Sequence, residues 1–417
     1  MTSRPPSATD LLTGLLGAAT AGIALAVLAG IALPLHVKAL MIIAAAAAVM
    51  ILAEIALFKT QANPSTGLSP ALLRPFSAER TFRKLIGFLA TLSAVGVAYW
   101  LLSEYQGDFY DPYWAALRLC VPWILLLSPV YIAYVDRRQV EPEDAYAAIG
   151  AMVVHGRLPR LGHELRQHIL GWIVKAFFLP LMFVYLCSSL ASVWALLADG
   201  SPDGLFGWYR TAIEAVYLFD VLFAAIGYVV TLRVLDTHIR TVEPTVLGWV
   251  ACLLCYQPFY AITSRYLPFG DAERWQAALP AWPVLQLAWG TAILACLLIY
   301  VWSTVCFGLR FSNLTHRGII TSGPYRWTKH PAYISKNLSW WLVSVPFLGQ
   351  ASFSDAMRLS LLLLLVNAIY LLRALTEERH LAWDPDYLAY RDFIRREGLA
   401  ARAVRLLRAR PAEVDGT

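Results

Sequence analysis

Charged residues are scarce in this chain. Lysine, arginine, aspartate and glutamate make up only 15% of its 417 residues, whereas 59% are hydrophobic, and the mean hydropathy is +0.56. A soluble globular protein carries about 25% charged residues, so this composition excludes an ordinary soluble fold. The net charge of +6 lies on no basic soluble domain, and we therefore expect no nucleic-acid partner.

Cysteine is also rare, and each of the six falls in an apolar segment rather than in a polar loop. Cys252 and Cys255 form a CxxC pair, but no second pair and no nearby histidine complete a metal site. We interpret the cysteines as small buried hydrophobic residues and expect no metal. A GxGxxG dinucleotide-binding motif is absent as well.

In place of charge, the chain has a series of long apolar stretches. A helix needs about 20 apolar residues to cross a hydrocarbon core about 30 Å thick. The predicted spans are 11–33, 39–58, 85–102, 114–135, 170–197, 212–232, 245–263, 280–307, 337–348 and 359–375. The stretch 337–348 is short and could be half of a broken helix, whereas 11–33 exceeds the apolar core of a signal peptide. We predict an all-α polytopic membrane protein with about ten transmembrane helices.

The loops alternate in charge, which predicts an orientation. The positive loops contain Arg74, Arg80, Arg83, Lys84; Arg137, Arg138, Arg157, Arg160, Arg166; Arg233, Arg240; and Arg310, Arg317, Arg326, Lys329, Lys336. The intervening loops contain Glu104, Asp108, Asp111; Asp199, Asp203; and Asp355. Because cytoplasmic loops are the positive ones, we expect both termini in the cytoplasm, in a membrane such as the bacterial inner membrane. The arginines of the tail suit anionic lipid headgroups.

The polar connection 136–168 is the longest, and its segment 144–158 mixes charges with apolar residues, which predicts an interfacial helix. We find no internal repeat. By content we divide the chain into an N-terminal transmembrane region (1–290) without recognised chemistry, a C-terminal unit (291–400) and a basic cytoplasmic tail (401–417).

Two polar motifs interrupt the apolar C-terminal region. They read TSGPYRWTKHPAY at 321–333 and TEERHLAWDPDYLAY at 376–390. Gly323 and Pro324 break a helix, and Pro331 disfavours helix at His330. Non-helical backbone near the bilayer must be buried in protein or line a wet cavity, so the polar side chains are expected to face a pocket. The alternative is an ordinary positive loop with aromatic interface anchors.

The two motifs resemble those of the isoprenylcysteine carboxyl methyltransferases and related membrane phospholipid methyltransferases. The first is similar to GPYxxxRHPxYxG, and the second to EExxL followed by YxxY. The likeness covers about a fifth of the chain, roughly 310–396. Two residues depart from the pattern. Lys329 replaces the usual arginine, which keeps the charge and loses the bidentate geometry, and Ser335 replaces a glycine.

The resemblance implies a cytoplasmic-facing pocket for S-adenosylmethionine in the final helices, reached by a lipid or lipidated acceptor from the bilayer. The catalytic candidates that it implies are His330, Glu378 and Arg391. The cofactor-binding candidates are Tyr325, Lys329, His330, Pro331, Tyr333, Glu377, Glu378 and Tyr387. Carboxylates and aromatic faces suit a sulfonium, which is cationic and accepts no hydrogen bond. Lys329 or Arg326 could pair with the methionine carboxylate. Which glutamate faces the cofactor stays open.

The acceptor also stays open. A carboxylate or phosphate is already ionised and needs no general base, whereas an amine acceptor needs one, and His330 or a glutamate could then serve. We therefore predict a membrane methyltransferase that uses S-adenosylmethionine, with O- or N-methylation undecided.

Two other classes remain as alternatives. Intramembrane carboxylates are rare and usually functional, so Glu54, Glu214 and Asp220 would also suit a lipid transporter or lipid-binding protein, although we put a structural role first. An NADPH-dependent sterol reductase ends in a similar hairpin, but such reductases usually have Asn immediately before the motif tyrosine, where this chain has Ala332.

Overall fold

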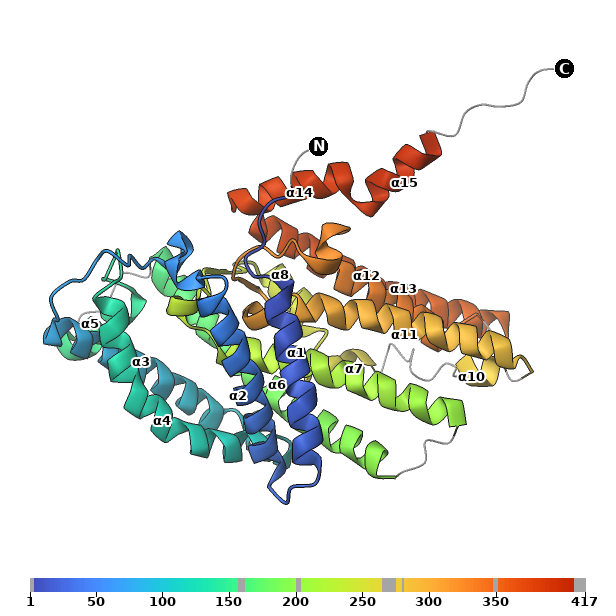
Figure 1. The fold of residues 1–417 in the computed structure, drawn as a ribbon, viewed down its shortest axis with the longest axis horizontal. Coiled ribbons are helices and arrows are strands. Elements are labelled where there is room, and N and C mark those ends of the chain that lie inside the picture. The colour runs from blue at the N-terminus through green and yellow to red at the C-terminus, as the bar shows by residue number, and fades with distance from the viewer. Residues whose placement is uncertain are drawn as a thin grey trace. The chain divides into compact units, whose positions relative to one another are not determined.

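The fold is helical in a computed structural model that describes residues 4–156, 162–199, 204–264, 275–279, 281–347 and 352–408 (Figure 1). It divides into two compact units. The N-terminal unit comprises residues 12–242 and 307–317, and the C-terminal unit comprises residues 1–11, 243–306 and 318–417. The all-α class is confirmed within the described residues, where the two strands have two residues each.

The N-terminal unit contains long helices joined by short 3-10 turns. Its elements are α1 (Leu11–Ala29), α2 (Leu35–Ala56), η1 (Thr60–Ala62), η2 (Pro64–Thr66), α3 (Ala78–Leu101), η3 (Ser103–Gln106), η4 (Asp108–Tyr110), α4 (Asp111–Asp136), α5 (Ala145–His155), α6 (His163–Ala198), α7 (Gly204–Val229), η5 (Arg233–Leu235), β1 (Thr241–Val242), η6 (Gly308–Arg310) and β2 (Thr315–His316). The strands pair antiparallel, with Thr241 opposite His316.

The C-terminal unit carries both polar motifs. Its elements are α8 (Val246–Leu253), α9 (Phe259–Ser264), α10 (Trp275–Ala278), α11 (Pro283–Val305), η7 (Gly323–Arg326), α12 (Pro331–Ser344), α13 (Phe353–Leu381), α14 (Pro385–Glu397) and α15 (Leu399–Arg408). Helices α11, α12 and α13 run side by side. The indole of Trp289 on α11 donates to the Leu342 carbonyl on α12 at 2.8 Å, and Trp341 donates to Asn367 on α13 at 2.7 Å.

Eight helices among the described residues are long and apolar enough to cross a membrane. They confirm eight of the predicted spans: Leu11–Ala29, Leu35–Ala56, Ala78–Leu101, Asp108–Asp136, His163–Ala198, Gly207–Val229, Pro283–Val305 and Phe353–Leu381. The chain is therefore a multi-pass integral membrane protein. Of the loop charges used to predict its orientation, Arg157, Arg160, Asp203 and Arg410 lie outside the described residues.

The other two predicted spans are shorter helices, for a local reason. In 245–263, α8 has eight residues and Pro258 separates it from α9, because proline cannot continue a helix. In 337–348, α12 starts earlier, at Pro331, and ends at Ser344. The next residue, Val345, has a left-handed backbone (φ 39°) and precedes Pro346. Its 14 residues extend only about 21 Å, and residue 348 lies outside the described chain.

The helix predicted within 144–158 is α5, and glycines hold it against α3. A Cβ on Gly87 of α3 would lie 1.9 Å from the carbonyl oxygen of Tyr146, and one on Gly150 of α5 would lie 1.8 Å from that of Arg83. Such small residues let two backbones approach closely. The Asp144 side chain caps α5 by accepting from the amide of Ala147 at 3.1 Å.

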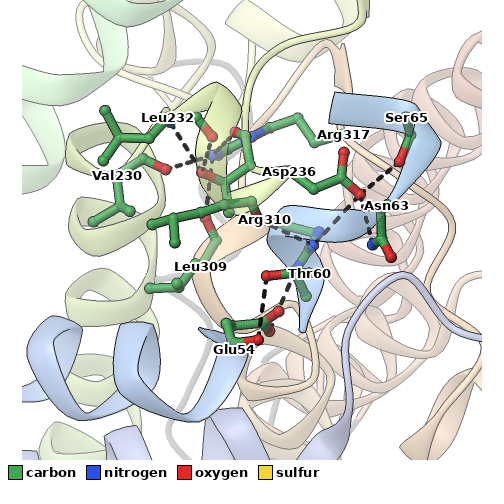
Figure 2. Close-up of polar contacts among 12 residues, drawn as sticks. Glu54, Thr60, Asn63, Ser65, Val230, Leu232, Asp236, Leu309, Arg310 and Arg317 are labelled. Atoms are coloured by element: carbon green, nitrogen blue, oxygen red, sulfur yellow. Dashed lines mark hydrogen bonds and ion pairs between the residues drawn. The ribbon is translucent and has the colours of Figure 1, made fainter. Parts of the chain in front are cut away.

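A buried charge cluster lies in the core of the N-terminal unit (Figure 2). Arg310 Nη1 lies 3.3 Å from Glu54 Oε1, and Arg310 Nη2 lies 3.8 Å from Asp236 Oδ2. The same Asp236 oxygen accepts from Ser65 at 2.7 Å and from Asn63 at 3.2 Å. Glu54 is thus neutralised within the fold, as expected for a structural intramembrane carboxylate.

Arg317 lies in the same region and donates hydrogen bonds to several backbone carbonyls (Figure 2). Its guanidinium donates to the carbonyl oxygens of Thr237 (2.7 Å), Gly227 (2.8 Å), Phe311 (2.8 Å), Val230 (2.8 Å) and Leu309 (3.1 Å). Burial, followed by the charge of Arg310, lowers the pKa of Arg317 to about 9. Arg310 and Arg317 are only 2% and 3% exposed, so these two arginines of the predicted positive loop are buried in the fold. They satisfy buried carbonyls where the chain leaves α7.

Candidate functional site

The first polar motif begins as the tight turn η7, which only glycine allows. Gly323 has φ +57°, and a Cβ on it would lie 2.3 Å from Cys306 Sγ. The amide of Thr321 donates to Ser7 Oγ at 3.2 Å, and its hydroxyl donates to the Pro5 carbonyl at 2.9 Å. The N-terminal segment therefore supports this turn, although it is more than 300 residues away in sequence.

The second motif forms the end of α13 and the start of α14, and its last tyrosine joins the two motifs. The phenol of Tyr390 donates to the Tyr325 carbonyl at 2.7 Å and to the Thr328 carbonyl at 3.2 Å. Farther along, the Leu399 amide donates to the Trp327 carbonyl at 2.9 Å. Carbonyl oxygens of the first motif's loop are thus held by a side chain of the second motif and by a backbone amide of α15.

The Glu378 carboxylate pairs with two residues of the first motif. Its Oε1 lies 2.9 Å from His330 Nε2, and its Oε2 forms an ion pair with the Lys329 ammonium. His330 is the N-cap residue of α12 but makes no side-chain capping hydrogen bond, and Pro331 at the first helical position removes an amide that would have no helical partner. This arrangement places the side chains of Lys329 and His330 together on one carboxylate.

The Glu377 carboxylate contacts two other residues, Tyr333 and Arg373. The Tyr333 phenol donates to its Oε1, and Arg373 Nε lies 3.4 Å from the same oxygen. Burial raises the pKa of Tyr333 well above its ordinary value, with Arg373 opposing and Glu377 adding to the rise. The phenol therefore stays protonated and serves as a donor. The second ring nitrogen of His330, Nδ1, lies 3.9 Å from Glu377 Oε2, so His330 lies between the two carboxylates.

The ring faces of this cluster are also ordered. His330 and Tyr333 stack with their ring centroids 5.5 Å apart and their planes 4° from parallel. The Arg373 guanidinium lies 5.1 Å from the centre of the Tyr333 ring and 5.7 Å from that of Tyr256. A cation over an aromatic ring face is stabilised by a cation–π interaction. The side chains of His330, Glu378, Lys329 and Glu377 are 20%, 23%, 27% and 32% exposed, so solvent or a ligand can reach each of them.

The structure does not place every predicted site residue alike. His330, Lys329, Tyr333, Glu377 and Glu378 form the cluster just described. Tyr325 and Pro331 are buried. The Tyr325 carbonyl accepts from Tyr390, and the Pro331 carbonyl accepts from the Ser335 hydroxyl at 2.8 Å. These two residues position the loop and the helix start. Ser335, where the family pattern has glycine, therefore returns its hydroxyl to its own helix.

Tyr387 and Arg391 lie beside the cluster on α14. Burial raises the pKa of the Tyr387 phenol, the charge of Glu378 adds to the rise, and the charge of Arg391 opposes it. Tyr387 is buried, whereas Arg391 is exposed. Of the two, only Arg391 can present its charge to an approaching molecule.

Sequence reasoning missed Arg373 and Tyr256. Arg373 lies four residues before Glu377 on the apolar helix α13, and a charge at this spacing within an apolar run is a signal that could have revealed it. Tyr256 carries no such signal, because it lies in the turn between α8 and α9. His380 Nδ1 lies 4.0 Å from Glu243 Oε2, which was also not predicted.

No curated protein and no solved structure is significantly similar to the chain. A family model does match its C-terminal part. The matched range includes the first motif and the paired glutamates, and it ends before Tyr387, Tyr390 and Arg391. Residues 285–383 match the isoprenylcysteine carboxyl methyltransferase (ICMT) family, which supports a membrane methyltransferase.

Proposed function

We propose that the chain transfers a methyl group from S-adenosylmethionine to a lipid or lipidated acceptor that bears a carboxylate, a phosphate or an amine. The observation that carries the proposal is the pairing of the two motifs. Each of the adjacent carboxylates, Glu377 and Glu378, is held by different residues of the first motif. The family match covers this same cluster.

The donor set of the cluster fits the proposed cofactor. An amino-acid moiety needs a cation for its carboxylate and an acceptor for its ammonium, and Lys329 and Glu377 offer these on half-buried side chains. The stacked faces of His330 and Tyr333 suit a sulfonium. When bound, S-adenosylmethionine supplies a methyl group activated by the positive charge on its sulfur.

The chain's own residues would act mainly by orientation. Glu378 holds His330 and Lys329, and Arg373 with Tyr333 holds Glu377, so the charged groups keep one arrangement before a reactant arrives. Orientation of this kind is a large part of the rate of a methyl transfer, which requires a linear approach. For an amine acceptor, His330 would take the proton at Nδ1, because its Nε2 faces Glu378.

The domain roles and the membrane contacts belong to the same proposal. The C-terminal residues 291–400 would carry the chemistry, 1–290 would shape access for the acceptor, and both motifs would face the cytoplasm. Helix α15 would lie on anionic headgroups, because Arg402, Arg405 and Arg408 recur every third residue while Leu406 and Leu407 are exposed.

The decisive experiment uses methyl-labelled S-adenosylmethionine. The purified full chain is incubated with total membrane extract, and the label is then separated into lipid, protein and small-molecule fractions. We expect label in one fraction, and its loss in a His330→Ala variant that unfolds at the same temperature as the wild type. An absence of cofactor binding and of transfer would overturn the proposal.

The acceptor class follows from the same separation and one further step. A methyl ester releases its label as methanol in mild base, whereas an N-methyl group keeps it. Base-labile label would indicate a carboxylate acceptor and make a general base unnecessary. Base-stable label in the lipid fraction would indicate an amine or a phosphate, because a methyl phosphodiester also survives mild base.

A further inference from the structure

The N-terminal unit contains a cavity of about 680 Å³ that the proposed methyl transfer does not use. Its walls come from α3, α4, α5, the first turns of α6 and the segment 231–240. Its lining contains no residue of either polar motif. Cavities of this size with a few convergent polar groups are the usual form of a small-molecule site.

Two cations of the wall have no carboxylate partner among the described residues. Lys175 Nζ donates to the Thr231 hydroxyl at 2.6 Å and lies 4.8 Å from the centre of the Trp172 ring. Arg233 Nη1 donates to the Thr66 carbonyl at 3.0 Å. Both side chains are half-buried. A half-buried cation without a counter-ion is costly in itself and is a strong site for an anion.

Other cations of the same cavity are paired, which sharpens the contrast. Lys84 lies 3.0 Å from Asp136, and Arg240 lies 3.1 Å from Asp236. The half-buried acid of the lining, Asp144, lies 3.3 Å from Lys84. The other acids, Glu141, Glu143 and Glu164, are exposed and lie toward solvent. The inner wall is therefore the part of the cavity with uncompensated positive charge.

His238 adds an unused polar atom to this inner wall. Its Nδ1 is buried and has no hydrogen-bond partner in the described chain. Burial, followed by the charge of Arg233, lowers the pKa of His238 to about 3; Asp236 opposes this, and Arg240 and Arg317 reinforce it. The ring is neutral at neutral pH and can present an N–H group at Nδ1. A buried polar atom without a partner calls for one.

Helix α6 is longer than a hydrocarbon core is thick, and its first turns line the cavity. With 36 residues, α6 extends about 54 Å, whereas the hydrocarbon core is about 30 Å thick. The helix exceeds the core by about 24 Å, and Lys175 lies about 18 Å from its first residue, so we place Lys175 outside the core with the excess at this end of the helix. Tryptophan and lysine are typical of that interfacial depth, and Trp172 and Lys175 share this turn of the helix.

We propose that this cavity binds a phosphate group, carried by a phospholipid or by a soluble phosphate ester. Lys175 and Arg233 would donate charge-assisted hydrogen bonds to its oxygens, and His238 would add a neutral one. The ring of Trp172 and the side chains of Val135 and Ile239 would cover the adjoining apolar part of the ligand. The site is separate from the proposed methyl transfer, so either proposal can fail without the other.

The test measures binding to the purified full chain by native mass spectrometry. The ligands are phosphatidylglycerol, diacylglycerol with the same acyl chains, and glycerol 3-phosphate. We expect the phosphate-bearing ligand to bind at least about tenfold more tightly than diacylglycerol, because a charge-assisted pair is lost in the latter. Binding of glycerol 3-phosphate would identify a soluble ester as the source, and binding of phosphatidylglycerol alone would identify the lipid.

Variants tie the binding to the cavity. We expect Lys175→Met and Arg233→Gln each to weaken phosphate binding about tenfold and Lys175→Arg to preserve it within about threefold, because the charge remains. Lys59→Met and Arg118→Gln remove exposed cations of the same unit and serve as matched controls. The proposal is overturned if no phosphate ligand binds, if diacylglycerol binds equally well, or if Lys175→Met and Arg233→Gln fold and bind like the wild type.

Discussion

The two units treat their charged residues in opposite ways. In the N-terminal unit, Glu54 and Asp236 both pair with Arg310, and all three are almost completely buried. In the C-terminal unit, Lys329 and Glu378 also pair, but about a quarter of each side chain's surface stays exposed to solvent. Both regions combine carboxylates with cations in an apolar chain, and solvent access is what separates them.

This difference indicates what each cluster does. A closed cluster whose donors are taken up by backbone carbonyls, as with Arg317, can only stabilise the fold. A half-open cluster can exchange part of its internal pairing for a ligand. Intramembrane charges should therefore be judged by their accessibility as well as by their presence.

The largest effect should come from breaking the closed cluster. We expect Arg317→Met to lower the free energy of unfolding by about 3–5 kcal/mol, because several buried carbonyls lose their donor. Thermal unfolding of the purified protein measures this, with Arg118→Met as the exposed arginine control. Equal stability of the two variants would remove the distinction between the clusters.

The open cluster should respond in activity rather than in stability. We expect Glu378→Gln to reduce methyl transfer about 100-fold, because Lys329 and His330 lose their common anchor and a small displacement is costly to an oriented reaction. The unfolding temperature should stay near that of the wild type. Glu397→Gln, which alters a half-exposed carboxylate of α14 that pairs with Arg405, is the control, and a similar loss of transfer there would contradict the assignment.

The pH dependence of stability should report on the interior of the N-terminal unit. His238 has a pKa of about 3 in the fold, against about 6.5 when unfolded. Below pH 6.5 the unfolded chain therefore binds a proton that the folded chain does not, and stability falls as pH falls toward 3. We expect a loss of about 2 kcal/mol between pH 7 and pH 5. Unfolding at several pH values tests this, because His238→Gln should flatten the profile and His155→Gln should not.

The smallest effect should come from substituting Lys329, which stands where the family pattern has arginine. Because arginine keeps the charge that Glu378 requires, we expect Lys329→Arg to change methyl transfer by no more than about threefold. Lys329→Met should reduce it about tenfold, since Glu378 then keeps only His330. Initial rates of labelled methyl transfer measure both. Equal rates for the methionine and arginine variants would show that the ion pair is dispensable.

Much of the helical architecture could be predicted from apolar length. Eight of the predicted spans are helices of spanning length, because about 20 apolar residues in succession have few other stable states in a bilayer. The two failures, 245–263 and 337–348, contain Pro258 and Pro346, whose effect outweighed the apolar composition. The number of spans therefore depended on single residues that interrupt a helix.

The site could be predicted only in part. The motifs pointed to His330, Lys329, Tyr333 and the paired glutamates, and the structure brings these five together. The sequence did not show which partners each glutamate binds, since adjacent glutamates on a helix point in directions about 100° apart. Arg373 and the backbone contacts of Tyr390 joined the site through packing that no local pattern specifies.

The sequence by itself determined that this protein resides in a membrane and which residue types form its candidate site, because apolar length and motif spacing are properties of the chain alone. Only the tertiary structure decided which charges are closed and which are open. Arg317 and Lys329 look equally like loop cations in the sequence. One lies among carbonyls in the core and the other on a half-exposed carboxylate, because burial depends on segments distant in the chain.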